Sequence, residues 1–146
     1  MTEFGAKLPA KTLVAGQAAG ESIILNEPLS FWGGFNPENG KIVDQKHPQA
    51  GATLTNKVLV MPSGRGSSSA SSILAESIRR GTGPRAIVLK EADAILALGS
   101  IVAAELYRVS CPIVQLKSED WEYLVGCSKL NICASAEEAY VQLSSD

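Results

Sequence analysis

Short apolar runs alternate with helical patterns in the second half of the chain. Val58–Met61 is apolar at every position, which predicts a strand covered on both faces. Arg85–Leu89 and Cys111–Leu116 read as two further short strands. A first helix is predicted between Val58–Met61 and Arg85–Leu89. Its apolar and small residues recur at helical spacing: Ala70, Ile73, Leu74, Ser77 and Ile78. With a second helix at Glu91–Tyr107, the order predicts parallel strands joined by right-handed crossovers.

The second helix is apolar around most of its circumference. Its apolar positions are Ile95, Leu96, Leu98, Ile101, Val102 and Leu106. A helix of this kind is either deeply buried or meets a partner, and the pattern leaves both open. Gly99 costs about 1 kcal/mol of helix propensity relative to alanine, so the helix is expected to break there into two pieces.

The first half of the chain reads as β-rich. Residues 1–10 have little pattern and predict a loose end. Thr12–Ala15, Glu21–Leu25 and Lys41–Asp44 read as short strands. The 146 residues fit one domain of the α/β class, in which the β-rich first half closes one side of a small sheet.

The last thirty residues change pattern and suggest no function. Glu119–Val125 predicts a short helix and Asn131–Ala134 a small strand. Ala136–Leu143 predicts an amphipathic helix capped by Ser135.

Composition excludes several classes of protein. A hydrophobic fraction of 45% with 19% charged residues is typical of a globular protein. The net charge of -2 offers no basic stripe for nucleic acid. No apolar run is long enough to cross a bilayer, and the N-terminus lacks the apolar core of a signal peptide. We therefore expect a cytoplasmic protein that binds neither nucleic acid nor membrane.

The three cysteines do not predict a metal site. Cys111, Cys127 and Cys133 lack the spacings of zinc or iron–sulfur ligands, and no histidine lies near them in the sequence. We expect free thiols, and no metal in this chain.

The loop after the first apolar strand carries the clearest candidate chemistry. Gly64 and Gly66 allow a ligand to approach the main chain, and a serine run then opens the helix. Free N–H groups at the helix start and the guanidinium of Arg65 favour a carboxylate or phosphate. The loop matches no Walker, dinucleotide-binding or nucleophile-elbow motif. An ordinary tight turn with solvated serines remains an equal interpretation.

A second glycine-rich segment and a lone histidine complete the candidates. In Leu29–Gly40, Phe31 and Trp32 are expected to plug the end of the sheet, which leaves Gly33 and Gly34 open to a ligand. His47 lies in a loop, where a lone histidine is more often a hydrogen-bonded or solvated residue than a functional one.

Several of these segments together resemble a known family. They are Pro28–Gly34, Asn36–Gly40, His47-Pro-Gln49 and above all Pro62-Ser-Gly-Arg-Gly-Ser67, followed by Glu91–Gly99 and Cys111–Val114. From about Gly16 to Leu116 the chain resembles the small, swivelling subunit of aconitase X enzymes. The tail 117–146 departs from the pattern expected of that family, and nothing is carried over onto it.

The resemblance implies an aconitase-type swivelling β/β/α domain that forms a heterodimer with a large catalytic subunit. In such a hydro-lyase the large piece holds an iron–sulfur cluster, while the small piece closes over the site and supplies a serine as proton acceptor. Matched motif to motif, that serine is Ser67. Gly64, Arg65, Gly66, Ser68, Gly33, Gly34 and His47 are then the expected substrate-binding residues.

The resemblance leaves two substrates open. Arg65 and the His-Pro-Gln segment are similar to bacterial enzymes that dehydrate cis-3-hydroxy-L-proline, whereas archaeal relatives with lysine at that place act on mevalonate 5-phosphate. The first substrate is favoured. Two other classes stay open on the residues alone: a non-catalytic module in which the loop binds an anion or a partner's carboxylate, and a serine hydrolase with His47 as base.

Overall fold

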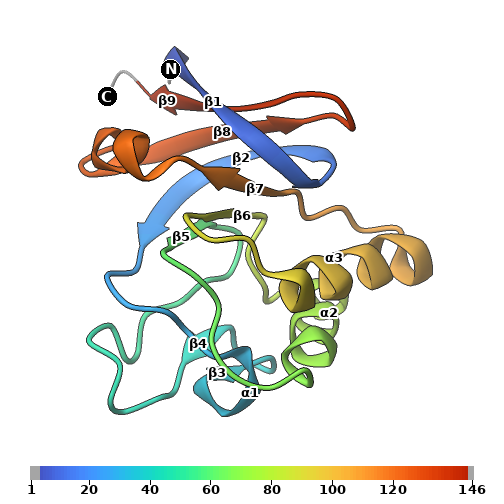
Figure 1. Ribbon diagram of the computed structural model, residues 1–146. Helices are drawn as coiled ribbons and strands as arrows, with labels where there is room; N and C mark the ends of the chain where they lie inside the picture. Colours follow the sequence, from blue (N-terminus) through green and yellow to red (C-terminus); the bar gives the residue numbers. More distant parts are fainter. Residues whose placement is uncertain (1–3, 145–146) are drawn as a thin grey trace.

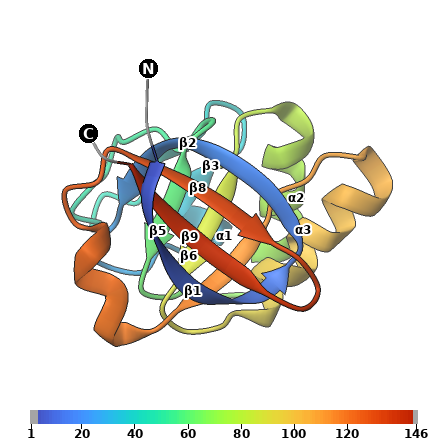
Figure 2. The ribbon, with the colours of Figure 1, turned by 90° about the horizontal axis from the view of Figure 1, so that it is seen from above.

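The chain is built around a closed seven-stranded barrel, seen from the side in Figure 1 and from above in Figure 2. The structure is a computed structural model that describes residues 4–144. In barrel order the strands are β1 (Phe4–Val14), β7 (Ile113–Leu116), β6 (Ala86–Leu89), β5 (Val58–Met61), β2 (Gly16–Ile24), β8 (Lys129–Ala134) and β9 (Ala139–Ser144). The remaining elements are α1 (Phe31–Gly34), β3 (Phe35–Asn36), β4 (Lys41–Ile42), α2 (Ala70–Arg80), α3 (Ala94–Tyr107) and a 3-10 helix (Ser118–Leu124).

The predicted strand–helix–strand series is confirmed. β5, β6 and β7 pair in parallel, and α2 and α3 make the two connections. β2 joins the same parallel set beside β5. Alternate residues of β5 explain its unbroken apolar run, because Val58 and Val60 pack inside the barrel while Leu59 and Met61 pack under the helices. A strand buried on both faces cannot alternate with polar residues.

The expected loose N-terminal end is wrong for residues 4–10. They belong to β1, which pairs with β7 on one side and with β9 on the other. Leu8 and Ala10 pack on the interior cluster, while Lys7 and Pro9 alternate with them. The pattern was weak because this strand depends on partners more than a hundred residues away. Residues 1–3 lie outside the described range.

The predicted helix at Ala136–Leu143 is also wrong. The segment enters β9 at Ala139, which forms a hairpin with β8 and pairs with β1. Val141 lies in the barrel interior at strand spacing from Ala139. In a segment this short, apolar residues fit both periods, and barrel closure decides between them. The predicted short helix before it appears as the 3-10 helix, and β8 contains the predicted strand.

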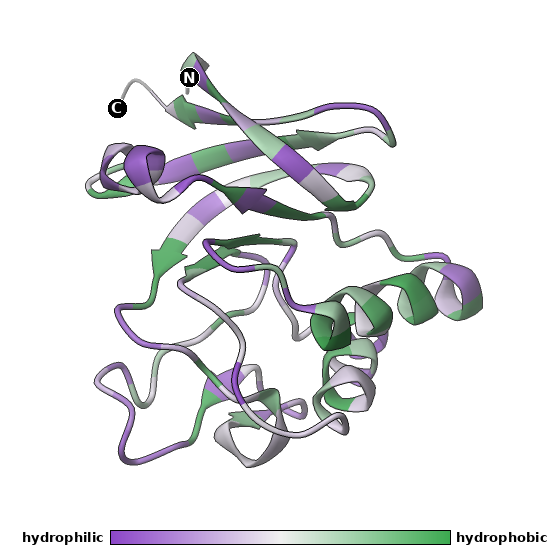
Figure 3. Cartoon of the chain, viewed as in Figure 1, coloured by the Kyte–Doolittle hydropathy of each residue, from purple (hydrophilic) through white to green (hydrophobic). Residues whose placement is uncertain are grey.

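α3 runs unbroken through Gly99, contrary to the expected break. A Cβ at Gly99 would lie 2.6 Å from the carbonyl oxygen of Ser71, so glycine is needed where α3 passes close to α2. The buried residues of α3 are Leu96, Gly99, Ser100 and Ala103. Its outer face leaves three large apolar side chains exposed, Leu98, Ile101 and Leu106, at 53%, 45% and 67%. Much of α3 accordingly has hydrophobic colouring in Figure 3.

The cysteines are free thiols, as expected. Cys111 is buried, and burial raises its pKa to about 12, so it stays protonated. Within residues 4–144, no three histidine, cysteine or acidic side chains gather as metal ligands would. None of the helices between those residues is long and apolar enough to cross a membrane.

Candidate functional site

Four chain segments leave the barrel at the carboxyl ends of its parallel strands. Because β2, β5, β6 and β7 run in the same direction, the loops that follow them share one edge. In open α/β sheets ligands bind at this edge. The predicted loop after β5 is among these segments, and in Figure 1 it descends from β5 past α1 before entering α2. β8 and β9 lie on the far side of the barrel from it.

The loop after β5 is held by its neighbours at two points. The carbonyl oxygen of Pro62 accepts hydrogen bonds from the backbone N–H groups of Lys90 and Glu91, at 3.1 and 3.0 Å. Gly64 then forms a parallel bridge with Leu29. The bridge to Leu29 brings the loop at Gly64–Gly66 beside the glycine-rich segment Leu29–Gly40.

Both glycines of the loop are required by close approaches. A Cβ on Gly64 would overlap the Asp93 carboxylate. Gly66 has a φ of 102°, and a Cβ there would lie 2.6 Å from Ser30 Oγ. The motif therefore packs main chain directly against the polar side chains of Ser30 and Asp93.

Ser67 is half-buried just before α2. Its hydroxyl oxygen accepts a hydrogen bond from the backbone N–H of Ser69 at 3.0 Å, and its carbonyl oxygen accepts one from Ala70 at 3.0 Å. The N-cap residue itself, Ser69, makes no side-chain capping bond. An N–H donor aimed at Ser67 Oγ favours negative charge on that oxygen.

The residues around Ser67 are open to solvent. Arg65, Gly66 and Ser68 are exposed, and Arg65 has no ion-pair partner among residues 4–144. The exposed guanidinium thus keeps its full set of donors for an incoming anion.

The aromatic segment divides differently from the prediction. Phe31 is buried, as a plug should be, and its ring centre lies 5.0 Å from the ring centre of Phe35. Trp32 is 56% exposed, so its predicted role as a plug is wrong. Gly33, at φ 84°, has no described atom within 4 Å of where a Cβ would lie. Gly34 is buried, and its carbonyl oxygen accepts from Val43 and Asp44. Only Gly33 is open.

His47 is buried and fully engaged with backbone. Its Nδ1 accepts from the N–H of Gln49 at 3.0 Å, which leaves the proton on Nε2 to donate to the carbonyl oxygen of Glu27 at 3.1 Å. Gln49 extends the link, donating to Ile24 O and accepting from Asn26 N. The His-Pro-Gln segment thus holds the chain that leads from β2 to Leu29. A direct contact between His47 and substrate stays a prediction.

Two polar residues at this site were not predicted. Ser30 lies against Gly66, and its hydroxyl donates to Trp32 O at 2.8 Å. Asp93 caps α3 by accepting from Ile95 N and Leu96 N, and its other oxygen faces Gly64. An aspartate just before an apolar helical run is a recognisable N-cap signal, so Asp93 could have been found from the sequence. Ser30 could not, because only folding brings it to Gly66.

A closed barrel with a glycine- and serine-rich loop at the carboxyl edge of its parallel strands is the arrangement of a swivel-type domain. The sequence matches the family described as the aconitase X swivel domain over residues 7–141, and the chain belongs to that family. The match extends beyond the segment from Gly16 to Leu116 that carried the resemblance, into β1 and the tail.

Named relatives are dehydratases or their subunits. The chain is 49% identical over 106 residues to a cis-3-hydroxy-L-proline dehydratase of Pseudomonas aeruginosa, covering 73% of this chain and 18% of the relative. It is 39% identical over 112 residues to a phosphomevalonate dehydratase small subunit of Pyrococcus furiosus, covering 77% of this chain and 84% of that one. The chain therefore spans less than a fifth of the Pseudomonas protein and most of the Pyrococcus one.

A solved structure shares the fold. The crystal structure of Thermococcus kodakaraensis aconitase X in its holo-form superimposes with a TM-score of 0.78 at 29% identity, over 95% of this chain and 98% of that one. The swivel fold predicted from sequence is confirmed.

Proposed function

We propose that this chain is the small, swivelling component of an aconitase X-type dehydratase, in which Ser67 accepts the Cα proton of a small hydroxy acid. The observation that carries the proposal is the hydrogen bond from Ser69 N–H to Ser67 Oγ, immediately before α2. A serine hydroxyl is a weak base. An amide donor, the start of a helix and the cation of Arg65, two residues away in the sequence, each favour its alkoxide.

The same loop suits the charge that the reaction builds. Removing a Cα proton next to a carboxylate moves negative charge onto the carboxylate oxygens. Donors fixed before the reaction stabilise such charge most efficiently. Arg65 and the exposed backbone at Gly66 and Ser68 are the groups we assign to that carboxylate, and we add the exposed Gly33 of the neighbouring segment as a further candidate.

Loss of the hydroxyl group requires a second component. The described cysteines of this chain do not gather as cluster ligands, so an iron–sulfur cluster does not fit here. We assign the cluster, which would act as Lewis acid on the leaving hydroxyl, to a large catalytic subunit. The isolated chain is then inactive, and the working enzyme is a heterodimer. Relatives named as small subunits support a partner of this kind.

The favoured substrate is cis-3-hydroxy-L-proline. The higher identity to the Pseudomonas dehydratase and the arginine at position 65 support it. Mevalonate 5-phosphate is the alternative, supported by the match along most of the Pyrococcus small subunit. Assaying the assembled complex on each compound separates the two, since turnover of only the phosphorylated compound would contradict our choice.

Replacing Ser67 by alanine tests the assignment of the base. In the complex, Ser67→Ala should lower kcat by about 10² to 10⁴-fold, because proton transfer to a positioned group contributes about that much. Assembly with the large subunit, measured by gel filtration, should not change. Ser72→Ala, on the exposed part of α2, is the matched control. Near-normal turnover by Ser67→Ala would show that another group removes the proton.

The non-catalytic alternative predicts a different result. If the loop only grips an anion, with Ser67 as a turn residue, the isolated chain should bind that anion tightly. Calorimetry of the isolated chain with cis-3-hydroxy-L-proline measures this. We expect weak binding, because the partner would complete the site.

A further inference from the structure

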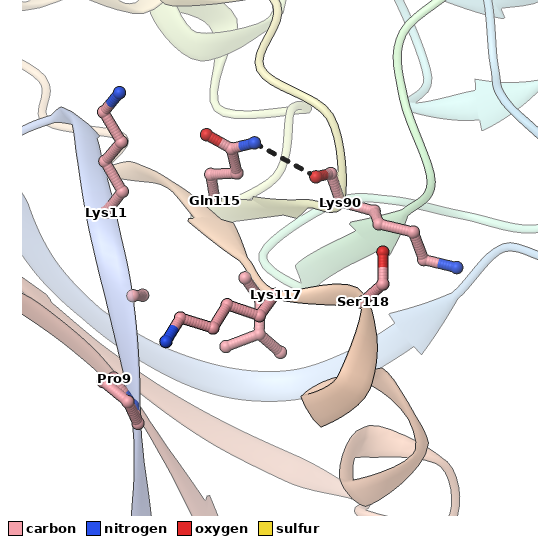
Figure 4. Close-up of a pocket in the computed structure, with 8 residues that line it drawn as sticks. Pro9, Lys11, Lys90, Gln115, Lys117 and Ser118 are labelled. Atoms are coloured by element: carbon pink, nitrogen blue, oxygen red, sulfur yellow. Dashed lines mark hydrogen bonds between the residues drawn. The ribbon is translucent and has the colours of Figure 1, made fainter.

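A pocket opens at the carboxyl ends of β6 and β7, and none of the glycine-loop residues lines it. It has a volume of about 510 Å³. Its lining consists of Pro9, Ala10, Lys11, Lys90, Gln115, Leu116, Lys117 and Ser118, seen in Figure 4. None of the predicted site residues is among them. A volume of this size falls in the range of about 300 to 1,000 Å³ that small-molecule sites occupy.

Strand register brings the polar lining residues together. Lys11 on β1 pairs with Gln115 on β7, and Gln115 pairs with Leu89, the residue before Lys90. Lys117 directly follows the end of β7 and lines the same pocket as Gln115. Four residues from three distant stretches of sequence thus converge on one outer patch of the barrel.

The pocket is positively charged in a chain whose net charge is -2. Three of its eight lining residues are lysines and none is acidic. Both ion pairs described within residues 4–144 involve Glu76 on α2, so none of the three lysines is neutralised by such a pair. Glu119 and Asp120 begin the neighbouring 3-10 helix but do not line the pocket. Uncompensated like charges beside one cavity are held there at an electrostatic cost that a bound anion would remove.

Part of the pocket is held in place. Gln115 Nε2 donates to the carbonyl oxygen of Lys90 at 3.2 Å, and the Lys90 ammonium lies 5.0 Å from the ring centre of Trp121. In Figure 4 the ammonium groups of Lys11, Lys90 and Lys117 point in three different directions, with the Gln115 amide between Lys11 and Lys90 and the Ser118 hydroxyl beside the Lys90 side chain. Separate cations around neutral donors suit a ligand with more than one negative group.

We propose that this pocket binds a small anion with at least two negative charges, carried by phosphate or carboxylate groups. The concave shape with apolar Pro9, Ala10 and Leu116 favours a compact molecule over an extended acidic segment of another protein. The site does not depend on the dehydratase function proposed above. Its ligand meets Lys90, whose backbone N–H also bonds Pro62 at the start of the glycine loop. Occupancy is thereby linked to the position of that loop.

Titration of the full chain with pyrophosphate and, separately, with citrate tests the proposal at constant ionic strength. We expect saturable binding in calorimetry, with amide shifts in NMR spectra confined to residues 10–11, 89–91 and 115–118. Lys90→Gln and Lys117→Gln should each weaken binding about tenfold, the size of one lost charged hydrogen bond. Lys46→Gln, an exposed lysine outside the pocket, should change nothing. Preference for pyrophosphate or citrate distinguishes phosphate from carboxylate ligands.

Four results would overturn the proposal. One is the absence of saturable binding by the folded chain. Another is binding by the Lys90→Gln and Lys117→Gln variants that is as tight as binding by the unmodified chain. The third is loss of binding in Arg65→Gln, which would locate the anion at the glycine loop. Tighter binding of an acidic peptide, in competition with pyrophosphate, would assign the pocket to a protein partner and would equally count against a small ligand.

Discussion

Single side chains at this site act mainly by holding backbone. Ser30 and Asp93 contact Gly66 and Gly64, where any Cβ would collide with them. His47 and Gln49 bind the carbonyl and amide groups between Ile24 and Glu27. Of these four residues only His47 was predicted to contact substrate, and its hydrogen bonds hold the segment that follows β2.

Gly66→Ala should impair both folding and activity. The φ of 102° is unfavourable for alanine by about 1 to 2 kcal/mol, and the new methyl group would push against Ser30 Oγ. Gly51→Ala is the control, because Gly51 has a similar φ of 91° but no described atom within 4 Å of the added Cβ. Thermal unfolding should show both losses of stability, whereas kcat of the complex should fall only for Gly66→Ala. Unchanged kcat in Gly66→Ala would contradict a catalytic role for the loop geometry.

His47→Ala should lower the free energy of unfolding by about 1 to 3 kcal/mol, because Gln49 N–H and Glu27 C=O lose their buried partner. Urea unfolding measures the change, with Gln45→Ala, an exposed neighbour, as control. If stability stays the same while KM rises, His47 contacts substrate and its backbone bonds are incidental.

At the scale of elements, α2 and α3 pack more closely than their side chains alone would suggest. Gly99 removes a side chain where the Ser71 carbonyl approaches α3. The sequence suggested a break in the helix at this glycine, whereas the structure shows the contact that explains it. α2 is the helix that follows Ser67, so this contact also fixes the direction in which α2 leaves the loop.

Gly99→Ala should destabilise the protein. Alanine gains about 1 kcal/mol of helix propensity. Overpacking against the Ser71 backbone costs about 1 to 3 kcal/mol and outweighs that gain. Differential scanning calorimetry should show a lower melting temperature, and a higher one would mean that the two helices can separate without cost.

At the scale of the whole molecule, the barrel closes on itself and leaves the glycine loop and the outer face of α3 exposed. The sequence predicted that α3 is either deeply buried or meets a partner. Its exposed apolar side chains favour contact with a partner. The relatives named as small subunits point to a large subunit as that partner. α3 and the glycine loop approach each other at Asp93, so one partner could cover both.

The double substitution Leu98→Glu and Ile101→Glu should therefore weaken assembly with the large subunit by at least about tenfold, since each charged group would be buried without a counter-ion. Analytical ultracentrifugation measures the affinity, and circular dichroism checks the fold. Tyr123→Glu is the control, because Tyr123 is 60% exposed on the 3-10 helix, which Figures 1 and 2 place away from α3. If the double variant binds the large subunit as tightly as the unmodified chain does, α3 faces solvent in the complex.

The sequence by itself determined what depends on neighbouring residues. The run Val58–Met61, the spacing of Ala70 to Ile78 and the glycine–serine motif define a strand, a helix and the loop between them, because period and backbone freedom are local properties. Only the tertiary structure decided that residues 4–10 and 139–144 are strands, since each needs hydrogen-bond partners supplied by the other end of the chain. It alone placed Ser30 on Gly66, Asp93 on Gly64 and three lysines around one pocket, because such meetings follow from barrel closure and strand register rather than from spacing.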